Sequence, residues 1–135
     1  MRSVLGALAV AGILSMALVQ SASAAEPTHT KDTLDTVKQN LKDNKAVLVD
    51  VREQDEWDAG HIAGAVLMPK SKLDVEKEAA ELAKKLNKTK IVYTHCKAGR
   101  RALACGEILK KQGFDVRALK PGYEELLKAG FEKAK

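Results

Sequence analysis

The segment HCKAGRRA, residues 95–102, contains a cysteine that an enzyme could use as a nucleophile. Cys96 follows the apolar run IVYTH, which predicts a buried strand, and precedes RRALACGEILKKQG, which predicts a helix. A loop between these elements brings backbone N–H groups and the first unpaired donors of the helix to one point, where they can bind an anion. The candidate anion-binding residues are Lys97, Ala98, Gly99, Arg100 and Arg101.

The same groups would stabilise the thiolate form of Cys96, which is the reactive form of the side chain. The loop amides, the positive end of the helix dipole and three cationic side chains all favour a negatively charged sulfur. Gly99 permits the backbone conformation that such a loop needs. The alternative is a buried structural cysteine, because a free Cys is often a small core residue. The cluster of cations and the glycine favour the reactive interpretation.

The elements around this loop alternate along the chain. Helical patterns cover residues 32–44, 52–60, 73–88, 100–113 and 123–130, and strand patterns cover 45–51, a short run before Pro69, 90–95 and 115–120. Asp32 is the expected N-cap of the first helix. The expected inward residues of the 73–88 helix are Val75, Ala79, Leu82 and Leu86.

Strands that alternate with helices predict an α/β fold, in which a mostly parallel sheet is covered by helices on both faces. The length of residues 25–135 suits a single domain. Functional sites in such sheets lie beyond the carboxyl ends of the strands. Cys96 occupies one of these ends.

The N-terminus predicts a signal peptide over residues 1–24, which cleavage would remove. Arg2 precedes an apolar stretch at residues 4–19, and the small residues 22–24 form a cleavage site. The stretch is shorter than the roughly 18 residues of a confident membrane span. We therefore expect a periplasmic or secreted protein without stable membrane association after cleavage; an uncleaved anchor is the alternative.

The charge of the chain is moderately basic. Removal of Arg2 lowers the count of Lys and Arg from 23 to 22, against 18 Asp and Glu, which leaves a net charge of +4. This balance slightly favours anionic small molecules. The lysines are scattered and are not interleaved with aromatic residues, so we expect a solvated surface and no nucleic-acid binding.

Cys105 has a different expected role from Cys96. It shares the inner stripe of its helix with Ile108 and Leu109, at spacings of i, i+3 and i+4. Two cysteines in an exported chain raise the question of a disulfide, because the compartment outside the cytoplasm is oxidising. However, a thiol in a surface loop and a thiol on the buried face of a helix should lie beyond bridging distance. We therefore expect Cys105 to be a core residue.

The segments VLVDVREQDEWDAGHIAGAVLMP and IVYTHCKAGRRALACGEILKKQGFDVRALKPGYEEL resemble a single-domain rhodanese, a thiosulfate sulfurtransferase, over about residues 45–131. The resemblance implies a three-layer α/β sandwich and a Cys96 that carries sulfur as a persulfide. It also implies that Cys96 to Arg101 form a six-residue loop. Asp50, Arg52 and Glu56 correspond to an ion-pair framework that supports the site.

Several nearby residues have expected structural roles. Pro121 in KPGYEEL replaces the first glycine of a Gly-Gly pair that many relatives have, which affects the far wall of the pocket. His61 is expected to form a hydrogen bond in a turn, and Trp57 to pack. His95 should point to the opposite face of its strand from Cys96, although a role in tuning the thiolate is an alternative. His29 is expected to be solvated.

The expected activity is transfer of sulfur from thiosulfate or a similar donor to cyanide or a thiol, through a Cys96 persulfide and without a metal or cofactor. One alternative is a non-catalytic module that relays a persulfide to a protein acceptor. Another is a cysteine phosphatase or arsenate reductase, in which an arginine lies six positions after the cysteine. Ala102 occupies that position here, and Arg101 lies five positions on. The shorter loop favours sulfur over phosphate.

Overall fold

The computed structural model of the chain describes residues 26–135. The predicted signal peptide and its cleavage site lie outside the described residues. Four parallel strands form one sheet in the order β2-β1-β3-β4. The strands are β1 (Ala46–Asp50), β2 (Val66–Leu67), β3 (Ile91–His95) and β4 (Asp115–Ala118).

The register of the two central strands determines where the site lies. Asp50 at the end of β1 pairs with His95 at the end of β3. The residues that directly follow these strands, including Arg52 and Cys96, therefore meet at the carboxyl edge of the sheet. The apolar runs of β1 and β3 agree with strands that are covered on both faces.

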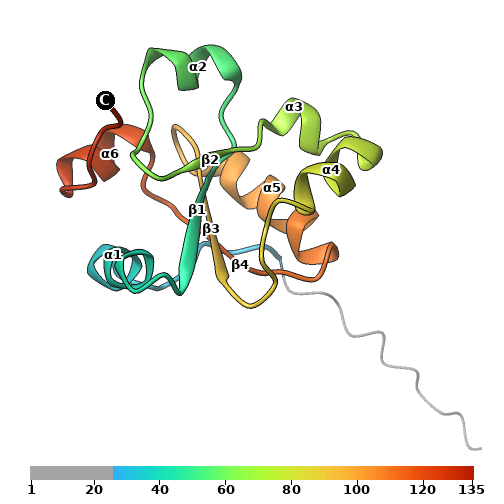
Figure 1. Ribbon diagram of the computed structural model, residues 1–135, viewed down its shortest axis with the longest axis horizontal. Helices are drawn as coiled ribbons and strands as arrows, with labels where there is room; N and C mark the ends of the chain where they lie inside the picture. Colours follow the sequence, from blue (N-terminus) through green and yellow to red (C-terminus); the bar gives the residue numbers. More distant parts are fainter. Residues whose placement is uncertain (1–25) are drawn as a thin grey trace, which may run out of the picture.

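Helices cover both faces of the sheet, which makes a three-layer α/β sandwich (Figure 1). One layer contains α1 (Leu34–Lys42) and α6 (Tyr123–Lys128), and the other contains α3 (Lys70–Leu73), α4 (Glu76–Ala83) and α5 (Arg100–Lys111). The short helix α2 (Gln54–Ala59) lies beyond the carboxyl end of β1. The predicted fold class is confirmed.

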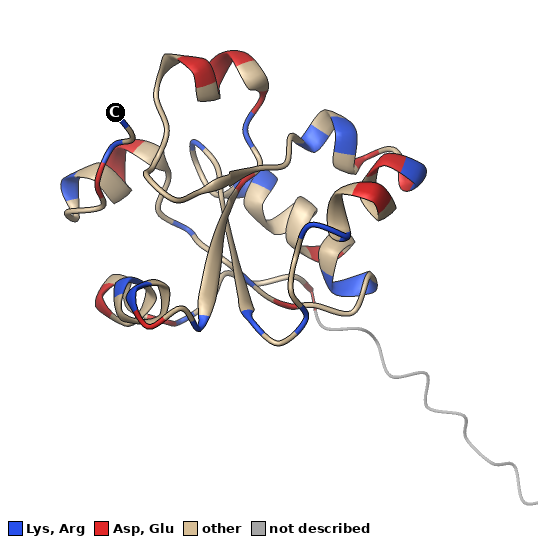
Figure 2. Cartoon of the chain, in the orientation of Figure 1, with Lys and Arg blue, Asp and Glu red and all other residues tan. Residues whose placement is uncertain are grey.

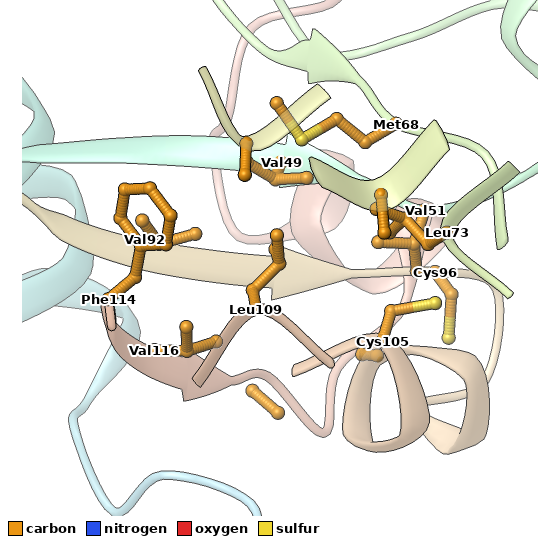
Figure 3. Close-up of a cluster of buried hydrophobic side chains, with 14 residues drawn as sticks. Val49, Val51, Met68, Leu73, Val92, Cys96, Cys105, Leu109, Phe114 and Val116 are labelled. Atoms are coloured by element: carbon orange, nitrogen blue, oxygen red, sulfur yellow. The ribbon is translucent and has the colours of Figure 1, made fainter. Parts of the chain in front are cut away.

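Two buried clusters join these layers. The first packs β-strand residues such as Val49 and Val92 against Leu73 of α3 and Leu109 of α5 (Figure 3). The second packs the other face of the sheet against Val37 of α1 and the closing helix. Because successive residues of a strand point to opposite faces, each central strand contributes to both clusters.

Two local predictions were wrong. Asp32 does not cap the first helix: Thr33 does, and its Oγ1 accepts a hydrogen bond from Thr36 N–H over 3.2 Å. The predicted helix at residues 73–88 is helical only over α4, apart from Leu73 at the end of α3: the backbone becomes extended at Val75 with φ −97° and ψ 112°, and α4 ends at Ala83. Val75 is therefore 48% exposed instead of facing the core, whereas Ala79 is buried as expected.

Charged residues of both signs lie on the helices of the two outer layers (Figure 2). Figure 2 shows Lys and Arg on helices of both outer layers, interspersed with Asp and Glu. Within residues 26–135, no helix is both long enough and apolar enough to span a membrane.

Candidate active site

Cys96 lies directly after β3, and α5 begins four residues later at Arg100. The loop between these elements begins the crossover that leads through α5 to the next parallel strand, β4. Gly99 is the N-cap of α5 and has φ 91°, in the left-handed region that favours glycine. From this position the Gly99 N–H donates a hydrogen bond to Cys96 Sγ over 3.0 Å. The donor and the positive end of the α5 dipole both favour negative charge on this sulfur.

The turn that precedes α6 holds the loop from the other side. The N–H of Tyr123 donates to the carbonyl oxygen of Cys96 over 2.9 Å. Gly122 lies so close to the loop that a Cβ atom there would overlap the carbonyl oxygen of Lys97. Pro121 leaves this contact intact, because the retained glycine at position 122 makes it.

Arg101 is bound to Glu56 rather than free in the loop. Its Nη1 donates to Glu56 Oε1 over 2.6 Å, and its Nη2 donates to Oε2 over 3.0 Å. The hydrogen bond from Arg101 lowers the pKa of Glu56 to about 2. Arg101 is expected from the sequence to bind the anion, but in the structure it pairs with Glu56 to form a clamp that joins α5 to α2.

Asp50 and Arg52 form the ion pair that the resemblance implies, and both side chains are buried. Arg52 Nη2 donates to Asp50 Oδ2 and to the carbonyl oxygen of Gly60, each over 2.8 Å. The guanidinium also lies 4.2 Å from the centroid of the Tyr123 ring. Glu56 is not a member of this pair. The Asp50 and Arg52 pair thus fixes the segment after β1 against the turn that holds the Cys96 loop.

His95 is fully buried next to this ion pair. Its Nε2 lies 3.6 Å from Asp50 Oδ2, and neither ring nitrogen has a hydrogen-bond partner within the described residues. Burial lowers the pKa of His95, with Asp50 acting in the opposite direction. The ring is therefore neutral near pH 7, and its position one residue before Cys96 on a strand directs it to the opposite face.

A pocket of about 250 Å³ opens beside the loop, lined by Arg52, Glu56, Ala59, Gly60, Lys97, Tyr123 and Glu124. The side chains of Lys97 and Arg100 are exposed and have no carboxylate partner within residues 26–135. Ala98, between them in the loop, is also exposed. Lys97 and Arg100 are therefore available to attract an anion. In the same part of the chain, no cluster of three or more His, Cys, Asp or Glu side chains could hold a metal ion.

The two cysteines differ in environment, and both are free. Cys105 is fully buried in the cluster between the sheet and α5 (Figure 3), and burial raises its pKa to about 12. It therefore remains a protonated thiol near neutral pH. Cys96 is also covered, with 1% exposure, where the sequence predicts a surface loop. The Cys96 side chain belongs to the same buried cluster as Cys105 (Figure 3), and the turn at residues 122–123 packs on the backbone of the loop from the other side.

Of the other two histidines, His61 has the contacts that the sequence predicts and His29 does not. His61 Nδ1 lies 3.1 Å from the carbonyl oxygen of Trp57, and the two rings stack with centroids 3.6 Å apart, as their predicted structural roles require. The sequence predicts a solvated His29, but its Nε2 lies 2.9 Å from the carbonyl oxygen of Gly99. No sequence signal identifies this contact, because His29 precedes the first regular element and its partner lies 70 residues away.

Comparison with known proteins identifies the family of this chain. The family model of the rhodanese-like domain matches residues 33–129. The chain belongs to the rhodanese-like domain family. The match runs from the N-cap of α1 to the end of α6 and includes Cys96 with its loop.

Three relatives of this rhodanese-like domain illustrate the similarity. It is 36% identical over 83 residues to the candidate sulfur carrier protein YrkF of Bacillus subtilis, covering 61% of this chain and 42% of the relative. It is 36% identical over 92 residues to the candidate adenylyltransferase/sulfurtransferase MoeZ of Mycobacterium tuberculosis, covering 68% and 21%. The thiosulfate sulfurtransferase GlpE of Coxiella burnetii is 33% identical over 85 residues, covering 62% and 74%. The chain thus spans less than half the length of the first two relatives.

Solved structures agree with this assignment. The human single-domain sulfurtransferase TSTD1 superposes with a TM-score of 0.58 at 28% identity, covering 76% of this chain and 96% of that protein. A rhodanese-related protein from Thermoplasma volcanium superposes with a TM-score of 0.61 at 26% identity, covering 75% and 93%. The family and these relatives support sulfur transfer as the general chemistry of the chain.

Proposed function

We propose that this rhodanese-like domain is a sulfurtransferase that moves sulfane sulfur from thiosulfate, or a similar anionic donor, to cyanide or a thiol. The observation that carries the proposal is the hydrogen bond from Gly99 N–H to Cys96 Sγ at the N-terminus of α5. This donor stabilises a thiolate, which is the nucleophile that sulfur transfer requires.

In the first step, the Cys96 thiolate attacks the outer sulfur of thiosulfate. A sulfur–sulfur bond forms to Cys96, the bond between the two sulfurs of thiosulfate breaks, and the electron pair leaves with sulfite. The total charge does not change, because a thiolate and a dianion become a persulfide anion and a dianion. Lys97 and Arg100 attract the donor, and the loop amides stabilise the anionic sulfur.

In the second step, the acceptor attacks the outer sulfur of the persulfide. Cyanide becomes thiocyanate, the bond between the two persulfide sulfurs breaks, and Cys96 is regenerated as the thiolate. Because the donor product leaves before the acceptor reacts, we expect ping-pong kinetics. Neither step requires a cofactor.

The test is the intact mass of the protein after treatment with thiosulfate. We expect a gain of one sulfur atom, which cyanide removes with the release of thiocyanate. The variant Cys96→Ser should gain no sulfur, whereas Cys105→Ala should behave as the wild type does. Sulfur that is gained equally by Cys96→Ser would overturn the assignment of the nucleophile.

A second candidate function is the relay of a persulfide to a protein acceptor, which the similarity to a candidate sulfur carrier favours. The same loop would then hold the persulfide, but small acceptors would discharge it slowly. An adduct that survives cyanide and yet disappears with a protein thiol would support relay over turnover.

The bidentate contact between Arg101 and Glu56 counts against a cysteine phosphatase or arsenate reductase. Such an enzyme needs an arginine that reaches the oxygens of the bound oxyanion. Arg101 instead uses two of its donors on Glu56. We therefore expect negligible hydrolysis of aryl phosphates by the unmodified protein.

A further inference from the structure

The segment that precedes the first helix, residues 26–32, lies against the candidate active site, and we call it the N-terminal strap. The family match begins at residue 33, so the strap lies outside it. The strap is fixed at two points. Thr30 N–H donates to the carbonyl oxygen of Ala118 over 2.8 Å. Asp32 Oδ2 accepts hydrogen bonds from Tyr93 over 2.7 Å and from Arg117 over 2.8 Å.

These anchors bring His29 onto the outer side of the Cys96 loop. Its Nε2 lies 2.9 Å from the carbonyl oxygen of Gly99. A carbonyl oxygen only accepts, so the imidazole donates from Nε2, as either its neutral or its protonated form can do. The fit is tight, because a Cβ atom on Gly99 would lie 2.9 Å from His29 Nε2.

Gly99 is therefore held at both of its backbone polar groups. Its N–H donates to Cys96 Sγ over 3.0 Å, and its carbonyl oxygen accepts from His29 and from Leu103 N–H. A glycine has the largest conformational freedom of any residue, so an unanchored Gly99 would lose the orientation of its N–H readily. The contact with His29 adds a second, shorter hydrogen bond to the one from Leu103 N–H and so restricts this freedom further.

The same contact also orients the next amide. In a trans peptide the carbonyl and the N–H point in opposite directions. Because His29 and Leu103 hold the Gly99 carbonyl, the N–H of Arg100 points the other way, toward the open N-terminal end of α5. This end of a helix favours anions.

We propose that His29 is a positioning residue of the sulfur-transfer site: by holding the Gly99 carbonyl it fixes the conformation of Gly99, so that the N–H groups of Gly99 and Arg100 stabilise the Cys96 thiolate and persulfide. The inference rests on the proposed function. His29 acts through Gly99 and does not contact the reacting atoms. The N-terminal strap is thus a component of the active site that this chain adds to the matched domain.

The test compares His29→Ala and His29→Gln with the control Lys31→Ala, an exposed position on the same strap. Loss of one hydrogen bond should lower kcat for thiosulfate and cyanide roughly fivefold in His29→Ala. The KM for thiosulfate should change less than about twofold, because Lys97 and Arg100 still capture the donor. The glutamine amide can donate from nearly the same place, so His29→Gln should restore most of kcat.

A second readout, independent of activity, is hydrogen exchange of the Gly99 amide measured by NMR. Exchange should accelerate in His29→Ala and return toward the wild-type rate in His29→Gln, with Lys31→Ala unchanged in both readouts. Wild-type kcat in a folded His29→Ala protein, or a glutamine variant that restores neither readout, would overturn the positioning role. If the wild type forms no persulfide, the proposed function fails, and the Gly99 exchange rates then test the contact by themselves.

Discussion

Cys96 and Cys105 lie on either side of the start of one helix, yet their sulfur atoms have different surroundings. Cys96 accepts a hydrogen bond from Gly99 N–H at the N-terminus of α5. Cys105 lies on the buried face of the same helix, where burial raises its pKa to about 12. A thiol that stays protonated is a poor nucleophile. The local environment, rather than the residue type, separates the two roles.

The variant Cys105→Ala should therefore affect stability and not catalysis. Truncation of a fully buried side chain leaves a small cavity, so we expect a loss of about 1–2 kcal/mol in the free energy of unfolding. Urea unfolding and the thiosulfate:cyanide assay measure the two effects. A Cys105→Ala protein that folds normally but is inactive would indicate that the two thiols act as a pair.

Arg100 should contribute to donor capture. Its side chain is exposed and is not held by a carboxylate within the described residues, unlike Arg101. We expect Arg100→Ala to raise the KM for thiosulfate several-fold, by roughly 1 kcal/mol of lost attraction, and to reduce its dependence on salt. Lys111→Ala, at the other end of α5, is the control. Equal KM values for the wild type and Arg100→Ala at low salt would contradict this role.

At the scale of the elements, the turn before α6 determines the shape of the Cys96 loop. Gly122 has φ −90° and ψ −176°, which any residue can adopt, so its requirement is steric. We expect Gly122→Ala to lose more than about 3 kcal/mol of stability, because the new Cβ atom would overlap the backbone at Lys97.

Gly64→Ala provides the matched control for this steric prediction. Gly64 has φ 81°, and a Cβ atom added there would have no neighbouring atom within 4 Å among the described residues. Alanine at this position should therefore cost only about 1 kcal/mol of backbone strain. Urea unfolding of both variants measures the difference. Similar losses in the two proteins would show that the approach of Gly122 to Lys97 is not critical.

The clamp between α2 and α5 should make stability depend on pH. The pKa of Glu56 in the folded protein is about 2, below its ordinary value of 4.5, because Arg101 donates to the carboxylate. Because the pKa is lower in the folded protein, the ionised Glu56 carboxylate stabilises the fold at pH values above its ordinary pKa of 4.5. This stabilisation is lost as the pH falls through the folded pKa of about 2.

The variant Glu56→Gln removes this titration. We expect it to lower stability by roughly 1 kcal/mol at neutral pH, and the difference from the wild type should shrink as the pH falls from about 5 toward 2. Asp55→Asn, on the exposed side of the same helix, is the control. Urea unfolding across this range measures the effect. A difference that grows with acidity would contradict the clamp.

For the whole molecule, we propose that the chain is exported and that residues 1–24 are removed. The prediction rests on Arg2, the apolar stretch at residues 4–19 and the small residues 22–24. The exported protein should begin at Ala25 or Glu26, and N-terminal sequencing of the extracytoplasmic fraction measures this. Protein that retains Met1 and sediments with membranes would indicate an uncleaved anchor.

The interior of the fold was largely predictable from local patterns. The apolar runs at β1 and β3 predicted strands covered on both faces, and the inner stripe of α5 placed Cys105 in the core. The break at Val75 was not predictable, because Val75, Ala79 and Leu82 follow one another at spacings of four and three, as on a single helical face, although Val75 is in fact extended and exposed. Periodicity predicts which side chains would share a face of a continuous helix, but it does not show where the backbone leaves the helix.

Contacts between distant segments required the tertiary structure. The sequence predicted Asp50, Arg52, Glu56 and Arg101 as site residues, but it did not predict that Arg101 binds Glu56. These contacts depend on how the ends of β1, α2 and α5 are placed in space. From the sequence alone, an arginine could pair with any of several nearby carboxylates, and only the fold shows which of them it contacts.

The sequence by itself supplied the family resemblance and predicted Cys96 as the nucleophile at the start of a short loop, because these inferences depend on residues that are neighbours in the chain. Only the tertiary structure decided that Cys96 is covered, that Gly122 approaches Lys97 and that His29 holds Gly99. The physical reason is that a hydrogen bond or a steric contact requires two groups within a few ångströms. For groups 70 residues apart, such as His29 and Gly99, that distance is set by the packing of the layers between them.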